Sequence, residues 1–246
     1  MYRYQILIEY VGTPFVGWQI QKKGKSVQKI IQSTLSKLLK QKIILYSAGR
    51  TDREVHANGQ SAHFDVENKI QNIDKMIKSL NFFLNKKMIS IINIKKKKIN
   101  FHARHSAKER TYLYIIQNRL SPSTLNKNKE WHIKKKLDIN LIKKGAKKLI
   151  GTFDYSTFRS SSCQAKSPIR TIKSIKIRSS KNKIEIEFKS QSFLQQQVRS
   201  MVGCLKYLGE KKWNLKTFDK VFKSKKRELC APPAPPEGLF LARVIY

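Results

Sequence analysis

The sequence predicts an α+β protein, because strand-like and helix-like segments alternate along it and several strand pairs read as antiparallel hairpins. Both halves of the 246 residues show this order, which predicts a sheet with helices on one face, made twice. A hydrophobic content of 40% is enough for a buried core. We therefore expect two α+β domains, residues 1–104 and 105–246.

The first half begins with a strand at residues 4–10, where β-branched and aromatic side chains dominate. Glycine and proline at residues 12–17 then predict a loop. Ser26 can cap a helix, because apolar residues recur every three or four positions from there to Leu38. The other expected elements of this half are a strand at 42–47, a strand at 61–66, a helix at 73–84 and a strand at 88–94.

The second half follows a break in the pattern at residues 101–105. A strand is expected at 111–117, and the polar segment 118–130 reads as a long loop. Strict alternation within 183–189 predicts a strand with one buried face. The other expected elements are a helix at 138–149, a strand at 170–178, helices at 193–209 and 215–223, a proline-rich loop and a final strand at 239–246.

The charge balance favours a polyanionic partner. Lysine and arginine number 52 against 16 acidic residues, so the formal net charge is +36. Such a charge favours nucleic acid, because neutralising phosphates releases counterions. Lysine is abundant everywhere, however, and the runs at 95–98 and 134–136 also read as solvated surface.

Cys163, Cys204 and Cys230 lie far apart and are odd in number, which argues against a disulfide framework and against a zinc site. This usage predicts a reducing compartment. No apolar run approaches the length of a membrane span, and the first ten residues lack the pattern of a signal peptide.

The sharpest local motif is Gly49-Arg50-Thr51-Asp52, in an expected loop between two strands. Asp52 is an acid in a chain short of acids, and flanking arginines would keep its carboxylate ionised, as a carboxylate nucleophile requires. A turn aspartate that accepts backbone hydrogen bonds explains the same residue without chemistry. No phosphate-binding loop, HExxH or GxSxG motif is present.

Six blocks, in order and spread over nearly the whole chain, resemble the TruA family of tRNA pseudouridine synthases. They are YVGTPFVGWQIQ with the following SVQ, AGRTDREVHANGQSAHFD, FHARHSAKERTYLYII, FRSSSCQAKSPIRTI, FLQQQVRSMVG and APPAPPEGLFLARVIY.

The resemblance implies a role for each matching residue. Asp52 matches the catalytic aspartate, and Tyr112 the tyrosine that packs on the target base. Arg199 matches the arginine that pairs with the carboxylate, and Arg50 an arginine associated with RNA contact and base displacement. Segments along the RNA are matched by Phe101, His102, Ala103, Arg104 and His105, and by Gln164, Ala165, Lys166 and Ser167.

The resemblance also implies a fold, a reaction and partners. Two α+β domains would join their mainly antiparallel sheets, with helices on the outer faces and a basic cleft between the domains. The implied reaction converts uridine to pseudouridine at positions 38, 39 and 40 of the tRNA anticodon stem-loop. The implied enzyme is a cytoplasmic homodimer that needs no metal or organic cofactor.

The implied chemistry breaks the C1′–N1 bond, turns the base and rejoins it through C5. A stacked base cannot turn, so the nucleotide must first be flipped into a pocket. An aromatic face such as that of Tyr112 can hold the base without fixing its edge, although an ordinary core tyrosine would look the same. Asp52 either attacks carbon or removes a sugar proton to give a glycal. Arg199 would orient that carboxylate, or else lie on the surface.

Nearby aromatic residues have plainer interpretations. His56 could be a general acid, but a structural hydrogen bond in the loop is the favoured interpretation. His63 alternates with its neighbours in a strand and is expected on a sheet face. Phe15 and Trp18 could stack on RNA, or could pack the domain edge.

The chain departs from the family pattern beside Asp52. Arg53 and Glu54 replace an alanine and a glycine; if that glycine has a positive φ, Glu54 adds roughly 1–2 kcal/mol of strain. Glu54 would also raise the pKa of Asp52 unless Arg53 offsets its charge. Val11 replaces an aspartate, and Gln197 stands where methionine is common.

Two rival functions follow from the altered loop and the charge. One is a non-catalytic RNA-binding protein that retains the fold. The other is a basic structural component, such as a ribosomal protein, which would bind RNA through charge alone.

Overall fold

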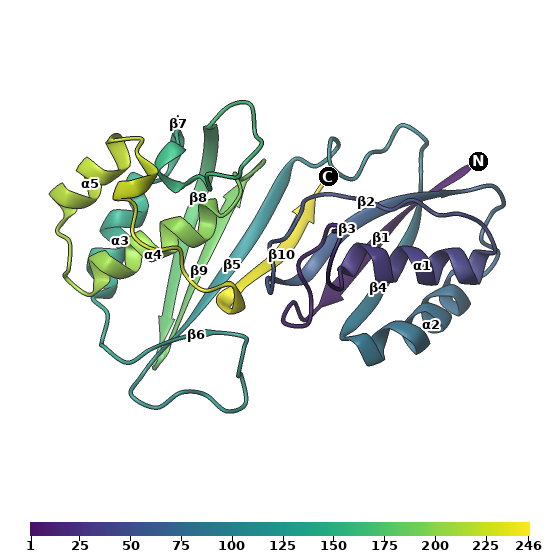
Figure 1. Cartoon of the computed structure of the whole chain (residues 1–246), viewed down its shortest axis with the longest axis horizontal. Helices are drawn as coiled ribbons and strands as arrows, with labels where there is room; N and C mark the ends of the chain where they lie inside the picture. The colour runs from purple at the N-terminus through teal and green to yellow at the C-terminus, as the bar shows by residue number, and fades with distance from the viewer. The chain divides into compact units, whose positions relative to one another are not determined.

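The computed structural model describes the whole chain, residues 1–246, and the chain forms two compact units (Figure 1). The first unit comprises residues 1–108 and 240–246, and the second residues 109–239. The mixture of strands with five α-helices agrees with the predicted class. The expected division after residue 104 differs in two respects, because residues 105–108 belong to the first unit and the final strand returns to it.

The first unit contains a sheet in the order β4–β1–β3–β10, with the short β2 also paired to β3. Strand β1 runs antiparallel to both of its neighbours, whereas β10 runs parallel to β3. The strands are β1 (Tyr2–Tyr10), β2 (Tyr46–Ser47), β3 (His56–Val66), β4 (Ile89–Lys97) and β10 (Leu239–Ile245).

Helices α1 (Val27–Leu39) and α2 (Ile73–Leu84) cover one face of this sheet (Figure 1). Alternate residues of β1, including Tyr4 and Ile6, are buried on that face, as the period of a strand requires. The predicted helix cap is confirmed, because the Ser26 hydroxyl accepts a hydrogen bond from the backbone N–H three residues later at 3.4 Å. The opposite face of the sheet carries more polar side chains.

The predicted strand at 42–47 is wrong for its first four residues. The segment does bury the alternate residues Ile43 and Leu45. Its backbone, however, bonds to side chains of α1 rather than to a strand: the Ile43 N–H donates to Ser36 Oγ at 3.0 Å and the Leu45 N–H to Gln32 Oε1 at 3.1 Å. Residues 42–45 therefore have the apolar alternation of a strand but do not pair with one.

The second unit contains an antiparallel sheet in the order β5–β9–β8–β7, and β6 pairs parallel to β5. Three α-helices pack with it. Its elements are β5 (Glu109–Asn118), β6 (Trp131–Ile133), α3 (Ile139–Lys148), β7 (Gly151–Asp154), β8 (Ile169–Ser180), β9 (Lys183–Ser190), α4 (Gln197–Gly209) and α5 (Leu215–Lys223).

Helix α4 begins four residues later than the predicted start at residue 193. Gln196 has a φ of 60°, which a helix cannot continue through. The Gln197 side chain accepts a hydrogen bond from the Leu194 N–H at 2.8 Å and closes the preceding turn.

The short strands β6 and β7 were not predicted. Four single 3₁₀ turns complete the chain: η1 (Asn85–Lys87), η2 (Ser156–Phe158), η3 (Arg227–Leu229) and η4 (Pro236–Gly238).

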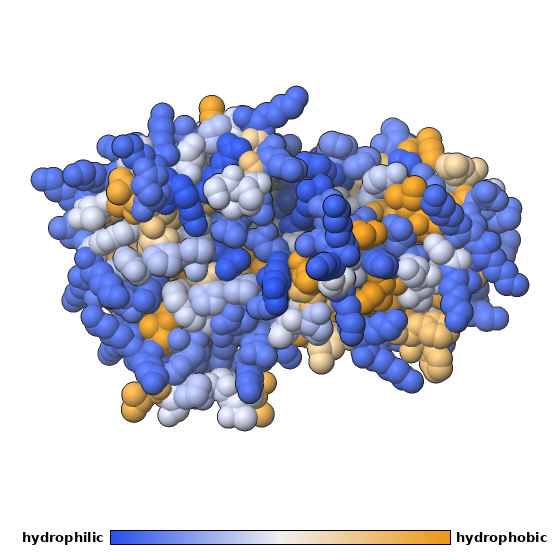
Figure 2. Space-filling view, viewed as in Figure 1, coloured by the Kyte–Doolittle hydropathy of each residue, from blue (hydrophilic) through white to orange (hydrophobic).

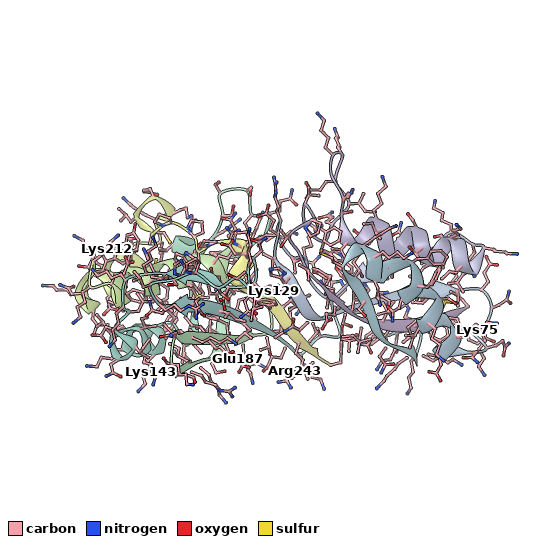
Figure 3. The ribbon with its side chains drawn as sticks, turned by 90° about the horizontal axis from the view of Figure 1, so that it is seen from below. Lys75, Lys129, Lys143, Glu187, Lys212 and Arg243 are labelled. Atoms are coloured by element: carbon pink, nitrogen blue, oxygen red, sulfur yellow. The ribbon has the colours of Figure 1, made fainter.

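The basic side chains spread over both units. Lys75 on α2, Lys143 on α3 and Lys212 after α4 are exposed and are labelled in Figure 3. The lysine runs at 95–98 and 134–136 are exposed except for the half-buried Lys97, which agrees with their interpretation as solvated surface. None of the α-helices combines the length and the apolar character needed to cross a bilayer.

Candidate active site

A cavity of about 700 Å³ lies beside α1 and α2, where Figure 2 shows hydrophobic side chains gathered on an otherwise mostly hydrophilic face. Its lining includes Ile30, Leu38, Phe83 and Met88, with several lysines and no acidic side chain. A reaction that needs a carboxylate therefore has its site elsewhere.

Asp52 lies in the loop between β2 and β3 and is half-buried. Two neighbours anchor this loop in the unit, since Thr51 and Val55 are only 6% and 2% exposed. Arg50, two residues before Asp52, is exposed. Buried residues thus lie on both sides of Asp52 in the sequence, whereas Arg50 reaches the surface. The buried residues hold the aspartate in a defined place.

The loop at residues 11–20 braces the Asp52 loop through the backbone. The Trp18 N–H donates to the Thr51 carbonyl at 3.1 Å, and the Glu54 N–H donates to the Phe15 carbonyl at 3.2 Å. Trp18 and Phe15 are buried, which confirms that they pack the unit rather than offer rings to RNA. Hydrogen bonds on both sides of Asp52 therefore restrain its backbone.

Two glycines allow this close approach. A Cβ on Gly12 would lie 2.3 Å from the Val55 carbonyl oxygen, and one on Gly17 would lie 2.8 Å from the Thr51 carbonyl oxygen. Gly17 also has a φ of +114°, which side chains rarely tolerate. The loop at residues 11–20, which belongs to the first of the six blocks, thus supports the Asp52 loop.

His56 has the structural role that was favoured from the sequence. Its ring is 1% exposed, and its Nδ1 accepts a hydrogen bond from the Gly12 N–H at 2.9 Å. The ring also stacks on Phe240, with centroids 4.6 Å apart. An Nδ1 that accepts must be unprotonated, so His56 links the bracing loop to β3 as a neutral imidazole.

Glu54 adopts a backbone conformation that suits glycine better than other residues. Its φ is 64°, in the left-handed region, so the predicted strain applies. Its carboxylate pairs with Arg53, Nε to Oε1 at 3.1 Å. Arg53 thus supplies a positive charge that offsets the negative charge of Glu54 beside Asp52.

Replacing Glu54 by glycine should raise the free energy of unfolding by about 0.5–1 kcal/mol, because relief of the left-handed strain exceeds the entropy cost of glycine. Urea denaturation measures this change. Glu54→Ala is the matched control, since it also loses the exposed ion pair but keeps the strain. Equal stability of the two variants would show that the backbone conformation costs little.

The segment Phe101–His105 is tied to the open face of the first unit's sheet. The Ala103 N–H donates to His63 Nδ1 at 3.1 Å, and the Tyr246 hydroxyl donates to the Ala103 carbonyl at 3.0 Å. His63 lies on a sheet face, as predicted, and is buried under this segment. Contacts from the protein itself therefore hold the segment that the resemblance implies to lie along the RNA.

Arg3 holds the same segment from β1. It donates two hydrogen bonds of 2.7 Å to the Asp65 carboxylate and one of 2.7 Å to the Phe101 carbonyl. The Phe101 ring packs on Tyr246, with centroids 4.9 Å apart. Arg3 and Tyr246 were not singled out from the sequence, and His63 was expected only on a sheet face, since nothing local marks residues that come together only in the folded sheet.

Burial lowers the pKa of His63 to about 4, and the nearby cations Arg3 and, when protonated, His102 act in the same direction. The imidazole is therefore neutral at pH 7, which is the form that can accept the Ala103 hydrogen bond. Protonation of His63 would remove this acceptor, so the attachment of residues 101–105 to the sheet depends on pH.

Acidification should destabilise the first unit through His63. Its pKa in the folded chain lies below the ordinary value of 6.5, so the unfolded chain binds more protons between those values and stability falls as the pH drops through that window. Between pH 7.5 and 5 the loss should be about 2 kcal/mol. Urea midpoints at both values measure it.

His63→Asn is the control for this loss, because an amide oxygen can accept the same hydrogen bond and does not titrate. The variant should lose about 2 kcal/mol less than the wild type over the same pH range. Parallel losses in both proteins would assign the acid sensitivity to other groups.

Tyr112 lies on β5 in the second unit, opposite Phe188 of β9, and is 8% exposed. Its ring meets Phe193 edge to face, with centroids 5.2 Å apart. An aromatic ring packed in this way has few rotamers and can present a fixed surface.

Arg199 lies in the first turn of α4 and is joined to the proline-rich segment that precedes β10. Its Nε donates to the Ala234 carbonyl at 2.7 Å, and the Ala234 N–H donates to the Arg199 carbonyl at 2.9 Å. Gly203 lets the segment approach, because a Cβ there would lie 2.1 Å from the Pro232 carbonyl oxygen. The half-buried guanidinium is thus oriented from outside its own helix.

The loop that contains Gln164–Ser167 is shaped by two arginines. The Arg159 guanidinium donates to the Ala165 carbonyl at 2.8 Å, and Arg170 donates to the Ser167 carbonyl at 2.9 Å. Gln164, Lys166 and Ser167 are exposed, as a nucleic-acid contact requires. Nowhere do three histidine, cysteine, aspartate or glutamate side chains gather in a way that could hold a metal ion.

The candidate residues fall into two groups. Asp52, Arg50 and residues 101–105 belong to the first unit; Tyr112, Arg199 and residues 164–167 belong to the second. Both units match one known family of proteins. A family model described as tRNA pseudouridine synthase matches residues 6–106 and 146–246. The chain belongs to the tRNA pseudouridine synthase family.

Individual relatives support this assignment over the full length of the chain. The chain is 67% identical to tRNA pseudouridine synthase A of Pelagibacter ubique, and the match covers all of both chains. It is 40% identical to the protein of that name from Parvibaculum lavamentivorans, again over both full chains. It is 42% identical to the one from Paramagnetospirillum magneticum, covering this whole chain and 96% of the relative.

Proposed function

We propose that the chain isomerises uridine to pseudouridine at positions 38, 39 and 40 of the tRNA anticodon stem-loop. The observation that carries the proposal is the doubly braced loop that presents Asp52, in a chain that belongs to the tRNA pseudouridine synthase family. A restrained carboxylate suits catalysis, because a reacting group held in place avoids the entropy cost of positioning it.

Each group has a part in the proposed reaction. The target uridine leaves the stem-loop stack and meets Asp52, which promotes cleavage of the C1′–N1 bond. Tyr112 stacks on the detached uracil, which turns and forms the C5–C1′ bond, while C5 loses a proton and N1 gains one. Arg199 orients the Asp52 carboxylate and favours its charged form.

We further propose the arrangement that these roles require. The sheets of the two α+β domains join, the helices lie on the outer faces, and a basic cleft between the domains receives the tRNA. The enzyme acts in the cytoplasm as a homodimer without a cofactor. The net charge of +36 supports polyanion binding.

The direct test incubates the purified chain with unmodified tRNA transcripts and maps pseudouridine through its stable carbodiimide adduct. Conversion at positions 38, 39 or 40 is the expected result. Binding of the transcript without any conversion would support the rival, a non-catalytic RNA-binding protein. Binding that shows no preference for tRNA at raised salt would indicate attraction by charge alone.

Replacement of Tyr112 by leucine should lower the turnover number by about 100-fold and leave the dissociation constant for tRNA within about threefold, because its ring is proposed to stack on the uracil only after the C1′–N1 bond is broken. Single-turnover kinetics and filter binding measure the two quantities. Tyr112→Phe keeps the ring and is the matched control. Equal losses of turnover and binding in Tyr112→Leu would contradict the stacking role.

A further inference from the structure

The open face of the first unit's sheet carries one continuous row of side chains across four strands. Lys95 of β4 pairs with Gln5 of β1, Gln5 with His63 of β3, and His63 with Tyr46 of β2. Residues paired across antiparallel strands point to the same side. Because α1 and α2 cover the other face, this row lies on the side that no helix covers.

Aromatic rings gather at the end of this row. Tyr46 stacks on His63 with centroids 5.1 Å apart and an interplanar angle of 20°. His102 touches both rings, at 6.0 Å from Tyr46 and 4.7 Å from His63, and His105 follows at 4.4 Å from His102. His63 is 1% exposed whereas Tyr46 is 46% exposed. The tyrosine is therefore the exposed ring of a stacked pair whose other ring is buried.

The rings of Tyr46, His63 and His102 are uncharged within a cationic surrounding. Desolvation lowers the pKa of both His63 and His102, so both imidazoles are neutral at pH 7 and act as flat aromatic surfaces. Arg3 and Arg104 act on these rings electrostatically, and the nearby Asp65 is bound to Arg3. A ligand with a flat neutral ring joined to an anionic group matches both properties.

We propose that Tyr46, supported by His63 and His102, is a stacking site for an unpaired nucleobase of the tRNA substrate. Stacking on aromatic side chains is a general way of holding unpaired bases, and the surrounding cations would attract the phosphates on either side. Tyr46 lies six residues before Asp52 on the same segment, so a base held there borders the catalytic loop. The inference rests on the proposed function for the identity of the RNA.

Tyr46→Ala should weaken the binding of an unmodified tRNA transcript about 10-fold at fixed salt, as expected for the loss of one stacked base. Tyr46→Phe should bind within about twofold of the wild type, because the ring remains. Phe82→Ala is the matched control, since Phe82 is an exposed aromatic residue (68%) on α2, and it should not change binding. A blunt RNA duplex should not distinguish any of these variants, because its bases are already stacked.

A second measurement does not depend on the stability of the alanine variant. In Tyr46→Trp the new indole should lose fluorescence when the transcript binds, beyond any change in the wild type, because stacking on a base quenches it. Unchanged indole emission at saturating tRNA, or a loss of duplex binding by Tyr46→Ala equal to its loss of tRNA binding, would overturn the proposal. Pseudouridine formation by the wild type is measured separately: quenching without conversion would refute the proposed reaction and leave the stacking site standing.

Discussion

Asp52→Asn should reduce pseudouridine formation by at least about 1000-fold, since removing a group that acts directly in the chemical step has effects of this size. Asparagine keeps the shape of the side chain but can neither attack carbon nor remove a proton. The anchors of the loop, Thr51 and Val55, are untouched, so the fold should persist. Single-turnover conversion of an unmodified tRNA transcript is the quantity to measure.

Binding provides the control for this variant. The dissociation constant for tRNA should change by less than about threefold, because most of the affinity comes from phosphate contacts elsewhere. Circular dichroism and urea denaturation verify that the variant is folded. A folded Asp52→Asn protein that still converts uridine at near wild-type rate would remove Asp52 from the reaction.

Gly12→Ala should lower the turnover number by about 100-fold even though residue 12 takes no part in the chemistry. The added methyl would lie 2.3 Å from the Val55 carbonyl oxygen, a backbone atom that cannot rotate away, so the two loops must separate. That movement weakens the bond between the Gly12 N–H and His56 and shifts the segment that carries Asp52. A displacement of about 1 Å at a reacting group can cost this much in rate.

Thr13→Ala is the matched control, because Thr13 is the exposed neighbour of Gly12 and its truncation adds no atoms. It should leave both turnover and stability close to those of the wild type. Gly12→Ala should also lose about 1–3 kcal/mol of stability, as overpacked sites do. Full activity in Gly12→Ala would show that the bracing loop does not position the catalytic segment.

Long periodic segments were predicted well from the sequence. Helix α2 has the expected bounds of 73–84 and α5 the expected bounds of 215–223, and the Ser26 cap forms as predicted. These features depend on interactions within one or two turns of chain, so the local sequence contains the necessary information.

Predictions that required a distant partner were less successful. Residues 42–45 have the alternation of a strand, yet their backbone bonds to side chains of α1. The final strand was expected in the second domain, but it pairs with β3 in the first unit. An alternating pattern specifies which residues are buried; it does not specify which neighbour supplies the hydrogen bonds.

The candidate site shows the same division. The order of the six blocks pointed to Asp52, Tyr112 and Arg199, and the unusual Glu54 predicted a strained backbone, which the φ of 64° confirms. The supports of these residues were missed. Ala234, which orients Arg199, has no chemical signature of its own, because its backbone alone makes the two hydrogen bonds.

The sequence by itself determined the chemical groups, the caps and the periodicity of this protein, since each is a property of neighbouring residues. Only the tertiary structure decided what holds the groups in place: the loop at 11–20 against the Asp52 loop, and Arg3, His63 and Tyr246 under the segment at 101–105. Such supports join residues from about 30 to 140 positions apart in the chain. Their energies depend on backbone positions that exist only once the sheet has formed.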